Sequence, residues 1–176
     1  LAHLEADRDE ISRVFFSGQK IGAVVDIKAG CSDSHHNGRT VHLLSYSSGL
    51  KLVYKPRCLD TDKAFTDLLI WVETHIATPG FKVARILSRA TYGWMEYVEH
   101  TDCKSLEEVK RYYQRAGMLL CLLYALNGTD CHRENLIACG EHPVLIDLET
   151  LLHRQFASAE AKLKDVRPPA YEQEES

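Results

Sequence analysis

Two periods of apolar residues divide this 176-residue chain into helical and extended segments. Apolar residues at helical spacing predict a short amphipathic helix within 4–16, a longer helix over 60–77 and a third from 105 to about 126. Runs rich in β-branched and aromatic residues predict strands at 21–27, 40–46, 50–55, 82–87 and 92–98. A turn at Ser47-Ser48-Gly49 joins the second and third strands, so the first three form an antiparallel sheet. The pattern predicts an α+β fold.

A hairpin is predicted near the end of the chain. Asn127 and Gly128 stop the third helix, and two short apolar runs follow, at 136–139 and 144–146, separated by a turn over 140–143. A hairpin of this length returns the chain on itself. It therefore predicts that Asp147 lies beside Asn135.

Acidic and amide residues are spaced around that hairpin in a way that indicates phosphoryl transfer. Asn135 follows Asp130 by five residues, and Asp147 follows Asn135 by twelve. This is the spacing of a kinase catalytic loop and its metal-binding aspartate. Mg²⁺ prefers oxygen ligands, so an amide and a carboxylate brought together can hold it. The alternative is that these are ordinary turn and helix-cap residues.

The predicted sheet carries further candidate nucleotide contacts. Lys55 lies at the end of the third strand after apolar neighbours, where a buried ammonium needs an anion such as a phosphate. The polar loop 30–39 stands between the first two strands, where a kinase has its phosphate-covering loop, although it is equally typical of a solvated connection. Residues 96–99 are a candidate adenine-binding connection. Whether Glu73, on the 60–77 helix, pairs with Lys55 stays open.

Composition narrows the class of protein. The chain is 45% hydrophobic with a net charge of −4, and it contains no block of Lys and Arg, so neither a nucleic-acid partner nor a membrane surface is indicated. Six scattered cysteines and the absence of a signal sequence or an apolar span predict a cytoplasmic protein that is not inserted in a membrane. Cys121, in an apolar run, is predicted to be buried. The first residue is not Met, so a piece of a longer chain is expected.

Four motifs in order resemble the dehydratase domain of the class II lanthipeptide synthetases, the LanM type. They are Asp33-x-His35-x-x-Gly38-Arg39, Val53-Tyr-Lys-Pro-Arg57, Asp130-x-His132-x-x-Asn135 and Asp147-Leu-Glu149. The resemblance covers about residues 4–154. It implies a protein/lipid-kinase-like fold, with a helical lead-in at 1–20, an antiparallel N-lobe at 21–99, the beginning of a mainly helical C-lobe at 100–154 and a polar tail at 155–176.

The resemblance also implies an activity. Enzymes of this family use ATP and Mg²⁺ to phosphorylate Ser and Thr of a ribosomally made precursor peptide with a leader, and then eliminate phosphate to leave dehydroalanine or dehydrobutyrine. The residues that carry out elimination, and a zinc-dependent cyclase domain, lie beyond the matched stretch, so activity of this chain alone is not expected.

Site residues follow from the same resemblance. Lys55 would bind nucleotide phosphates, and Asp130 would orient or deprotonate the acceptor hydroxyl with support from His132. The metal would be held by Asn135, Asp147 and Glu149, which also contribute to nucleotide binding. Asp33 and His35 match the phosphate-side loop and are further candidate catalytic residues.

Three other interpretations stay open. An aminoglycoside-type small-molecule phosphotransferase shares the Asp-x-x-x-x-Asn loop, and an inactive kinase-like remnant would retain the motifs without the reaction. A zinc-binding module is the third, with its candidate ligands at Cys131, His132, Cys139 and His142.

Overall fold

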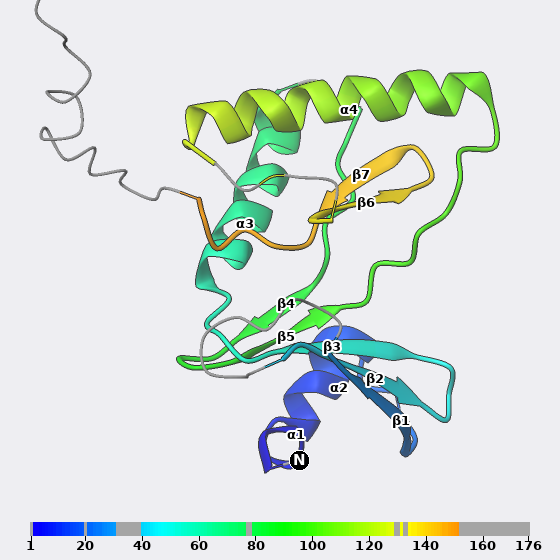
Figure 1. The fold of residues 1–176 in the computed structure, drawn as a ribbon, viewed down its shortest axis with the longest axis vertical. Coiled ribbons are helices and arrows are strands. Elements are labelled where there is room, and N and C mark those ends of the chain that lie inside the picture. Colours follow the sequence, from blue (N-terminus) through cyan, green and yellow to red (C-terminus); the bar gives the residue numbers. More distant parts are fainter. Residues whose placement is uncertain are drawn as a thin grey trace, which may run out of the picture.

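The computed structural model describes residues 2–19, 21–30, 40–76, 79–128, 131 and 134–151. Its helices are α1 (Ala2–Ala6), α2 (Arg8–Phe16), α3 (Asp60–His75) and α4 (Leu106–Ala125). Its strands are β1 (Val24–Ala29), β2 (His42–Tyr46), β3 (Lys51–Lys55), β4 (Ile86–Ser88), β5 (Gly93–Glu96), β6 (Leu136–Cys139) and β7 (His142–Leu145). Figure 1 shows a sheet with helices on both sides.

The larger sheet has five strands in the order β1-β2-β3-β5-β4, and all its neighbours pair antiparallel. The α+β class and the antiparallel pairing of the first three strands are therefore confirmed. The predicted strands at 82–87 and 92–98 are shorter in the structure, three and four residues. A second sheet consists of β6 and β7 alone.

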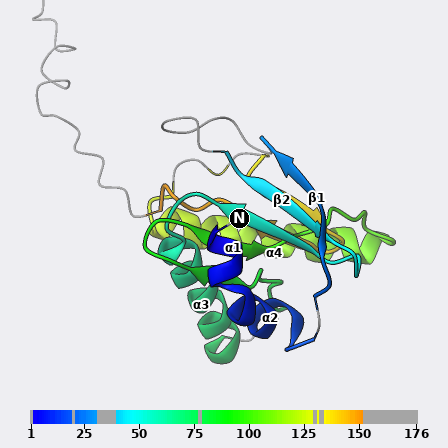
Figure 2. The same cartoon turned by 90° about the horizontal axis from the view of Figure 1, so that it is seen from below.

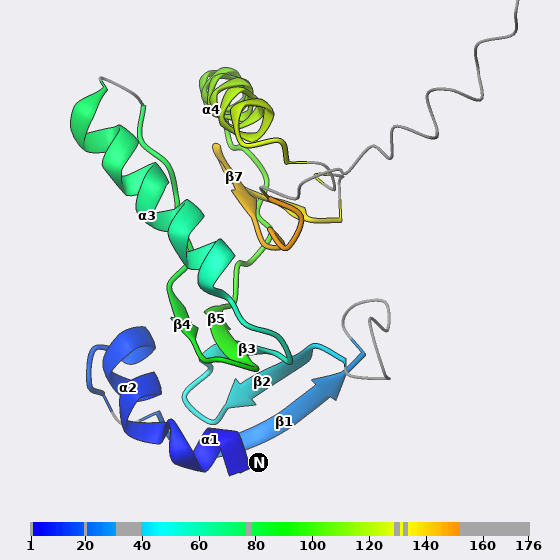
Figure 3. The same ribbon diagram turned by 90° about the vertical axis from the view of Figure 1, so that its left-hand side faces the viewer.

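One face of the five-stranded sheet is closed by the N-terminal helices. Side chains alternate between the faces of a strand, so Leu44, Leu52 and Trp94 point to the same side. They pack against Ile11 and Phe15 of α2. Figures 2 and 3 show α1 and α2 together on this side of the sheet.

The opposite face meets the β6–β7 hairpin. Val53 and Met95, which are cross-strand partners, belong to an apolar cluster with Val144 and Ile146. A further core joins α3, α4 and the hairpin through Phe65, Leu119 and other side chains. In Figure 1, α3 rises from the sheet toward α4, and the hairpin lies between α4 and the sheet. The two sheets are thus held together by apolar packing.

Helix α4 begins where the sequence predicts and is only half covered. Ser105 is its N-cap, and the Ser105 hydroxyl accepts a hydrogen bond from the Glu108 amide. Leu119 and Leu123 are buried, whereas Leu120 is 67% exposed on the outer face. Cys121 lies on that exposed side, so the prediction that it is buried is wrong. The apolar run contained enough leucines for both faces, and periodicity could not separate them.

None of the helices in the described part of the chain combines the length and apolar character needed to cross a membrane.

Candidate functional site

The β6–β7 hairpin brings Asn135 and Asp147 together, as predicted. Leu136 pairs with Leu145, and the Ile146 amide donates to the Asn135 carbonyl at 3.0 Å, which continues the register one pair beyond the strands. Asp147 is the next residue. The turn is tighter than predicted, because His142 already pairs with Cys139 and only Gly140 and Glu141 connect the strands. Gly140 has φ of 57°, which a residue without a Cβ adopts without strain.

Lys55, the last residue of β3, lies inside the protein and is 5% exposed. Its Nζ donates a hydrogen bond to the main-chain carbonyl of Ile146, next to Asp147 in sequence. Burial lowers the pKa of Lys55, and the negative charge of Asp147 partly offsets that effect. The structure therefore confirms an interior lysine and places it against the segment that ends the hairpin.

Arg57 and Asp62, to which the sequence analysis gave no role, lie beside Lys55 and Asp147. Arg57 makes a forked pair with Asp62, with distances of 2.7 Å from Nη1 to Oδ2 and 3.1 Å from Nη2 to Oδ1. The same guanidinium donates from Nη2 to Oδ1 of Asp147, and its Nε lies 3.6 Å from a carboxylate oxygen of Glu149. Burial alone would lower the pKa of Arg57, but Asp62, and then Asp147 and Glu149, raise it above its ordinary value. Arg57 therefore stays charged.

Asp62 carried a signal in the sequence. It lies three residues before Phe65 and seven before Leu69, so it occupies the apolar stripe of α3. Its side chain is 0% exposed. A carboxylate on the buried face of a helix requires a cationic partner, and Arg57 is five residues away.

Glu73 does not pair with Lys55. Its carboxylate accepts a hydrogen bond from the Phe81 amide, at the far end of α3. Glu73 lies on the same face of α3 as Asp62, but it is too far along the helix to reach Lys55. Glu73 follows Asp62 by eleven residues, which is about 16 Å along the axis. Since α3 meets the site at its first turn, Asp62 is the acidic residue that reaches it.

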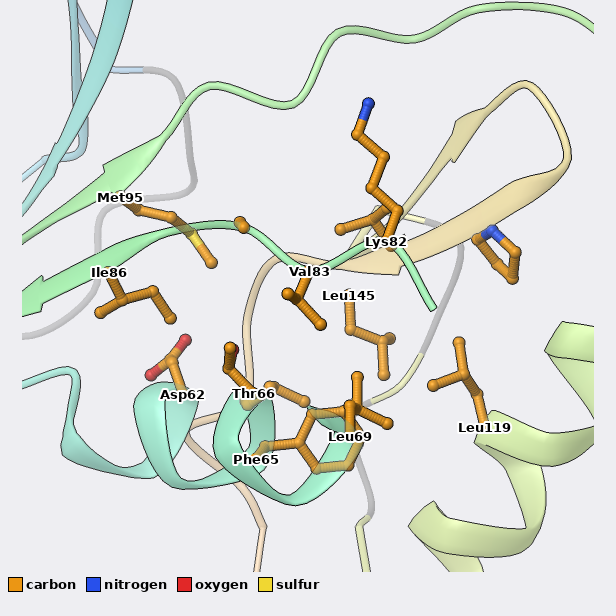
Figure 4. A pocket seen from close by; sticks show the side chains of 14 residues that line it. Asp62, Phe65, Thr66, Leu69, Lys82, Val83, Ile86, Met95, Leu119 and Leu145 are labelled. Carbon is orange, nitrogen blue, oxygen red and sulfur yellow. The ribbon is translucent and has the colours of Figure 1, made fainter. Parts of the chain in front are cut away.

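Asp62 also lines a cavity, but one that is too small for a ligand (Figure 4). The cavity has a volume of about 10 Å³ and lies among α3, α4, β7 and the segment that contains Lys82 and Ile86. That volume accommodates about one water molecule. Asp62 therefore acts on Arg57, not on a bound molecule in this cavity.

The connection after β5 places main-chain groups beside apolar side chains. Val98 is buried, and among the described residues its main-chain amide and carbonyl have no hydrogen-bond partner. Half-buried Val53, Ile137 and Ile146 belong to the same apolar cluster as Val98. An aromatic base can stack on such side chains while its edge bonds to free backbone groups. The predicted role of residues 96–99 remains a prediction.

The predicted metal ligands suit a hard cation. Asn135, Asp147 and Glu149 offer amide and carboxylate oxygens, the donors that Mg²⁺ prefers. The side chains of Asp147 and Glu149 are 27% and 43% exposed, so both are reachable from solvent. The hydrogen bonds of the described residues engage only one oxygen of Asp147. The donor set therefore fits Mg²⁺.

Asp33, His35, Asp130 and His132 lie outside the described residues. Among the described residues, no three His, Cys, Asp or Glu side chains gather as a metal cluster, which leaves the zinc-module interpretation without support there.

Comparison with known proteins agrees with the motifs. Residues 1–175 match the family described as a domain of unknown function (DUF4135). The chain is also 38% identical over 126 residues to the lacticin 481/lactococcin biosynthesis protein LcnDR2 of Lactococcus lactis subsp. lactis. That alignment covers 67% of this chain and 14% of the relative, so the chain spans only a small part of it. The chain therefore belongs to the DUF4135 family, and its resemblance to the class II lanthipeptide synthetases is confirmed.

Proposed function

We propose that this chain is the nucleotide-binding part of a kinase-like dehydratase in lanthipeptide biosynthesis. The relative named above is a lacticin 481/lactococcin biosynthesis protein, which supports this pathway class. A precursor peptide with a leader is then the substrate, and Ser and Thr hydroxyls are the groups modified. The relative favours this reading over an aminoglycoside-type phosphotransferase, which would use a similar nucleotide site.

One observation carries the kinase-like part of the proposal. Lys55, from the five-stranded sheet, reaches the carbonyl of Ile146, ninety-one residues later in the chain. The fold thereby joins a buried cation to the hairpin that carries Asn135 and Asp147. A lysine, an asparagine and an aspartate, in this order along the chain, are the residues with which kinases bind and orient a nucleoside triphosphate.

The chain's own residues then have distinct roles. The Lys55 ammonium has three N–H donors and, among the described residues, gives one to Ile146, so a phosphate oxygen could accept from another. Phosphate also supplies the negative charge that burial makes favourable at this position. Val98 and the half-buried apolar residues around it would orient the base. Asp130 would accept the proton of the acceptor hydroxyl.

Asn135, Asp147 and Glu149 would hold Mg²⁺, which when bound neutralises charge on the transferred phosphoryl group. Elimination requires removal of an α-proton and charge compensation for the departing phosphate. The resemblance implies that those groups lie outside residues 4–154. The complete reaction is therefore proposed for the complete natural protein.

Calorimetric titration of Mg·ATP tests the nucleotide site. Saturable binding should be lost in Asp147→Asn, with circular dichroism showing that both proteins are folded. Asp26→Asn, an exposed change on β1, is the matched control and should bind like the wild type. Equal affinity in wild type and Asp147→Asn would contradict the proposed site.

Mass spectrometry of the precursor peptide tests the reaction. Incubation with the complete protein and ATP should yield phosphorylated peptide and peptide that has lost water at Ser or Thr. Nucleotide binding without either product would instead indicate an inactive kinase-like remnant.

A further inference from the structure

Arg57 stands between carboxylates from two separate parts of the chain. Asp62 comes from the first turn of α3, whereas Asp147 and Glu149 follow β7. We infer that Arg57 and Asp62 form a positioning pair that orients Asp147 for the cation and links the start of α3 to the site. This inference rests on the proposed function and adds two residues to it.

The Arg57–Asp62 fork fixes the plane of the guanidinium. Each oxygen of Asp62 accepts from a different Nη of Arg57, at 2.7 and 3.1 Å, and Asp62 is fully buried. Nη1 also donates to the Cys58 carbonyl at 3.1 Å. A bidentate pair restrains orientation as well as distance. The direction in which Nη2 presents its hydrogen to Asp147 is therefore set by Asp62.

The contact with Asp147 leaves that carboxylate able to bind a cation. A carboxylate has two oxygens and about four acceptor positions. Arg57 occupies Oδ1 of Asp147, and among the described residues no donor occupies Oδ2. Hydrogen bonds to a ligating carboxylate from outer residues orient it, and losing them typically lowers metal affinity about 10- to 100-fold.

Charge supports the same assignment. The two cations Lys55 and Arg57 face the three carboxylates of Asp62, Asp147 and Glu149. The group keeps one net negative charge because Asp62 compensates Arg57. Without Asp62, the positive charge of Arg57 would compete with a cation for Asp147 and Glu149.

The geometry also explains how α3 reaches the site. Asp62 lies in the first turn of α3, where the partial positive charge of the helix terminus favours an acidic residue. Since Glu73 is bonded to Phe81, the connection between α3 and the site runs through this first turn. Displacing the start of α3 would move Asp62, then Arg57, then Asp147.

Cation affinity in the complete natural protein tests the inference. The probe is Mn²⁺ in the presence of a non-hydrolysable ATP analogue, followed by electron paramagnetic resonance, with analogue binding measured separately without metal. Asp62→Asn and Arg57→Lys should each weaken Mn²⁺ binding about 10- to 100-fold. Both should change metal-free analogue binding by less than about threefold, which is below 1 kcal/mol. Arg57→Lys keeps the charge but loses the fork, so it isolates orientation.

Asp67→Asn is the control, because it removes a carboxylate from the same helix whose one ion pair among the described residues is with the exposed Lys63. Its Mn²⁺ affinity should equal that of the wild type. A second readout is independent of cation binding: the Arg57 guanidinium ¹⁵N resonances should be restrained in the wild type and averaged in Asp62→Asn.

The outcomes separate the two proposals. If Asp62→Asn fails to fold, Arg57→Lys decides. Wild-type Mn²⁺ affinity in a folded Arg57→Lys variant would overturn the positioning role and leave the proposed function intact. Absence of Mn²⁺ and nucleotide binding in the wild type would overturn the proposed function, and the positioning role with it.

Discussion

The two faces of the five-stranded sheet each carry an arginine between acidic residues, and they use it differently. On the face covered by α1 and α2, Arg89 donates to Oδ1 of Asp7 at 2.8 and 3.0 Å and also contacts Glu10. Trp94 donates to the other oxygen of Asp7 at 2.8 Å. On the opposite face, Arg57 occupies only one oxygen of Asp147.

The difference lies in acceptor capacity. Both oxygens of Asp7 are satisfied by protein donors, and its side chain is 6% exposed. That network is closed and ties the N-terminal helices to the sheet. Asp147 is 27% exposed and keeps an unused oxygen among the described residues. A cluster of charges that has satisfied all its acceptors stabilises the fold, whereas one with spare acceptors can bind a ligand.

Removing Asp7 should produce the largest effect on folding. Asp7→Ala leaves the Trp94 Nε1 without its acceptor and removes two hydrogen bonds of Arg89, which keeps Glu10, and the free energy of unfolding should fall by about 3 kcal/mol. Urea unfolding followed by Trp fluorescence measures it. Asp9→Ala, an exposed change two residues away, should cost less than about 0.5 kcal/mol. Equal losses in both variants would show that the closed network has no special weight.

Removing Lys55 should weaken nucleotide binding without lowering the free energy of unfolding. Lys55→Met should weaken nucleotide binding by about 2 kcal/mol, roughly 30-fold, because a charged donor to phosphate is lost. The free energy of unfolding should stay the same or rise, because burial disfavours this charge. Calorimetry and urea unfolding on the same samples measure both quantities. A destabilised variant with normal binding would reverse the contrast between the two faces.

Acid should weaken the closed network first. Burial would raise the pKa of Asp7, but hydrogen bonds from Trp94 and Arg89 outweigh it and hold the pKa below its ordinary value of 3.8. The stabilisation is therefore complete above about pH 4 and is lost as the pH falls through the folded-state pKa. Unfolding free energies measured from about pH 2 to about pH 6, a range that brackets this ordinary value, should fall more steeply for the wild type than for Asp7→Asn. Parallel curves would contradict this role of Asp7.

The smallest effect should come from an exposed pair. Lys63 and Asp67 are one helical turn apart on α3 and lie 2.7 Å from each other, both largely exposed. Lys63→Ala should change the free energy of unfolding by less than about 0.5 kcal/mol. Adding about 1 M salt should reduce even that difference, because the Debye length falls to about 3 Å. A larger change would mean that exposure is a poor guide to the weight of an ion pair here.

The sequence predicted those features of the fold that depend on residues close together in the chain. Strands β2 and β3, helix α3 and the β6 bounds follow from periodicity and turn residues. The same reasoning brought Asn135 and Asp147 together, because a hairpin's geometry is set by its own length. An interior Lys55 followed from its apolar neighbours.

What it missed depends on how elements pack. Arg57 is the last residue of the motif Val53-Tyr-Lys-Pro-Arg57, but its partners come from α3 and from the segment after β7. Glu73 was a candidate because spacing gives the face of a helix and not which end meets the site. The exposed side of α4 was missed for a related reason, since apolar residues occur on both of its faces.

The tight β6–β7 turn also constrains the number of residues between Asn135 and Asp147. Each residue of β6 faces one residue of β7, with Gly140 and Glu141 as the only connection. One inserted residue in either strand would slip the register and reverse which side chains face the sheet. Insertions tolerated here must therefore extend both arms equally or bulge outward from the turn. The twelve-residue spacing therefore sets how Asn135 and Asp147 meet, and the site depends on this length as well as on the two residues.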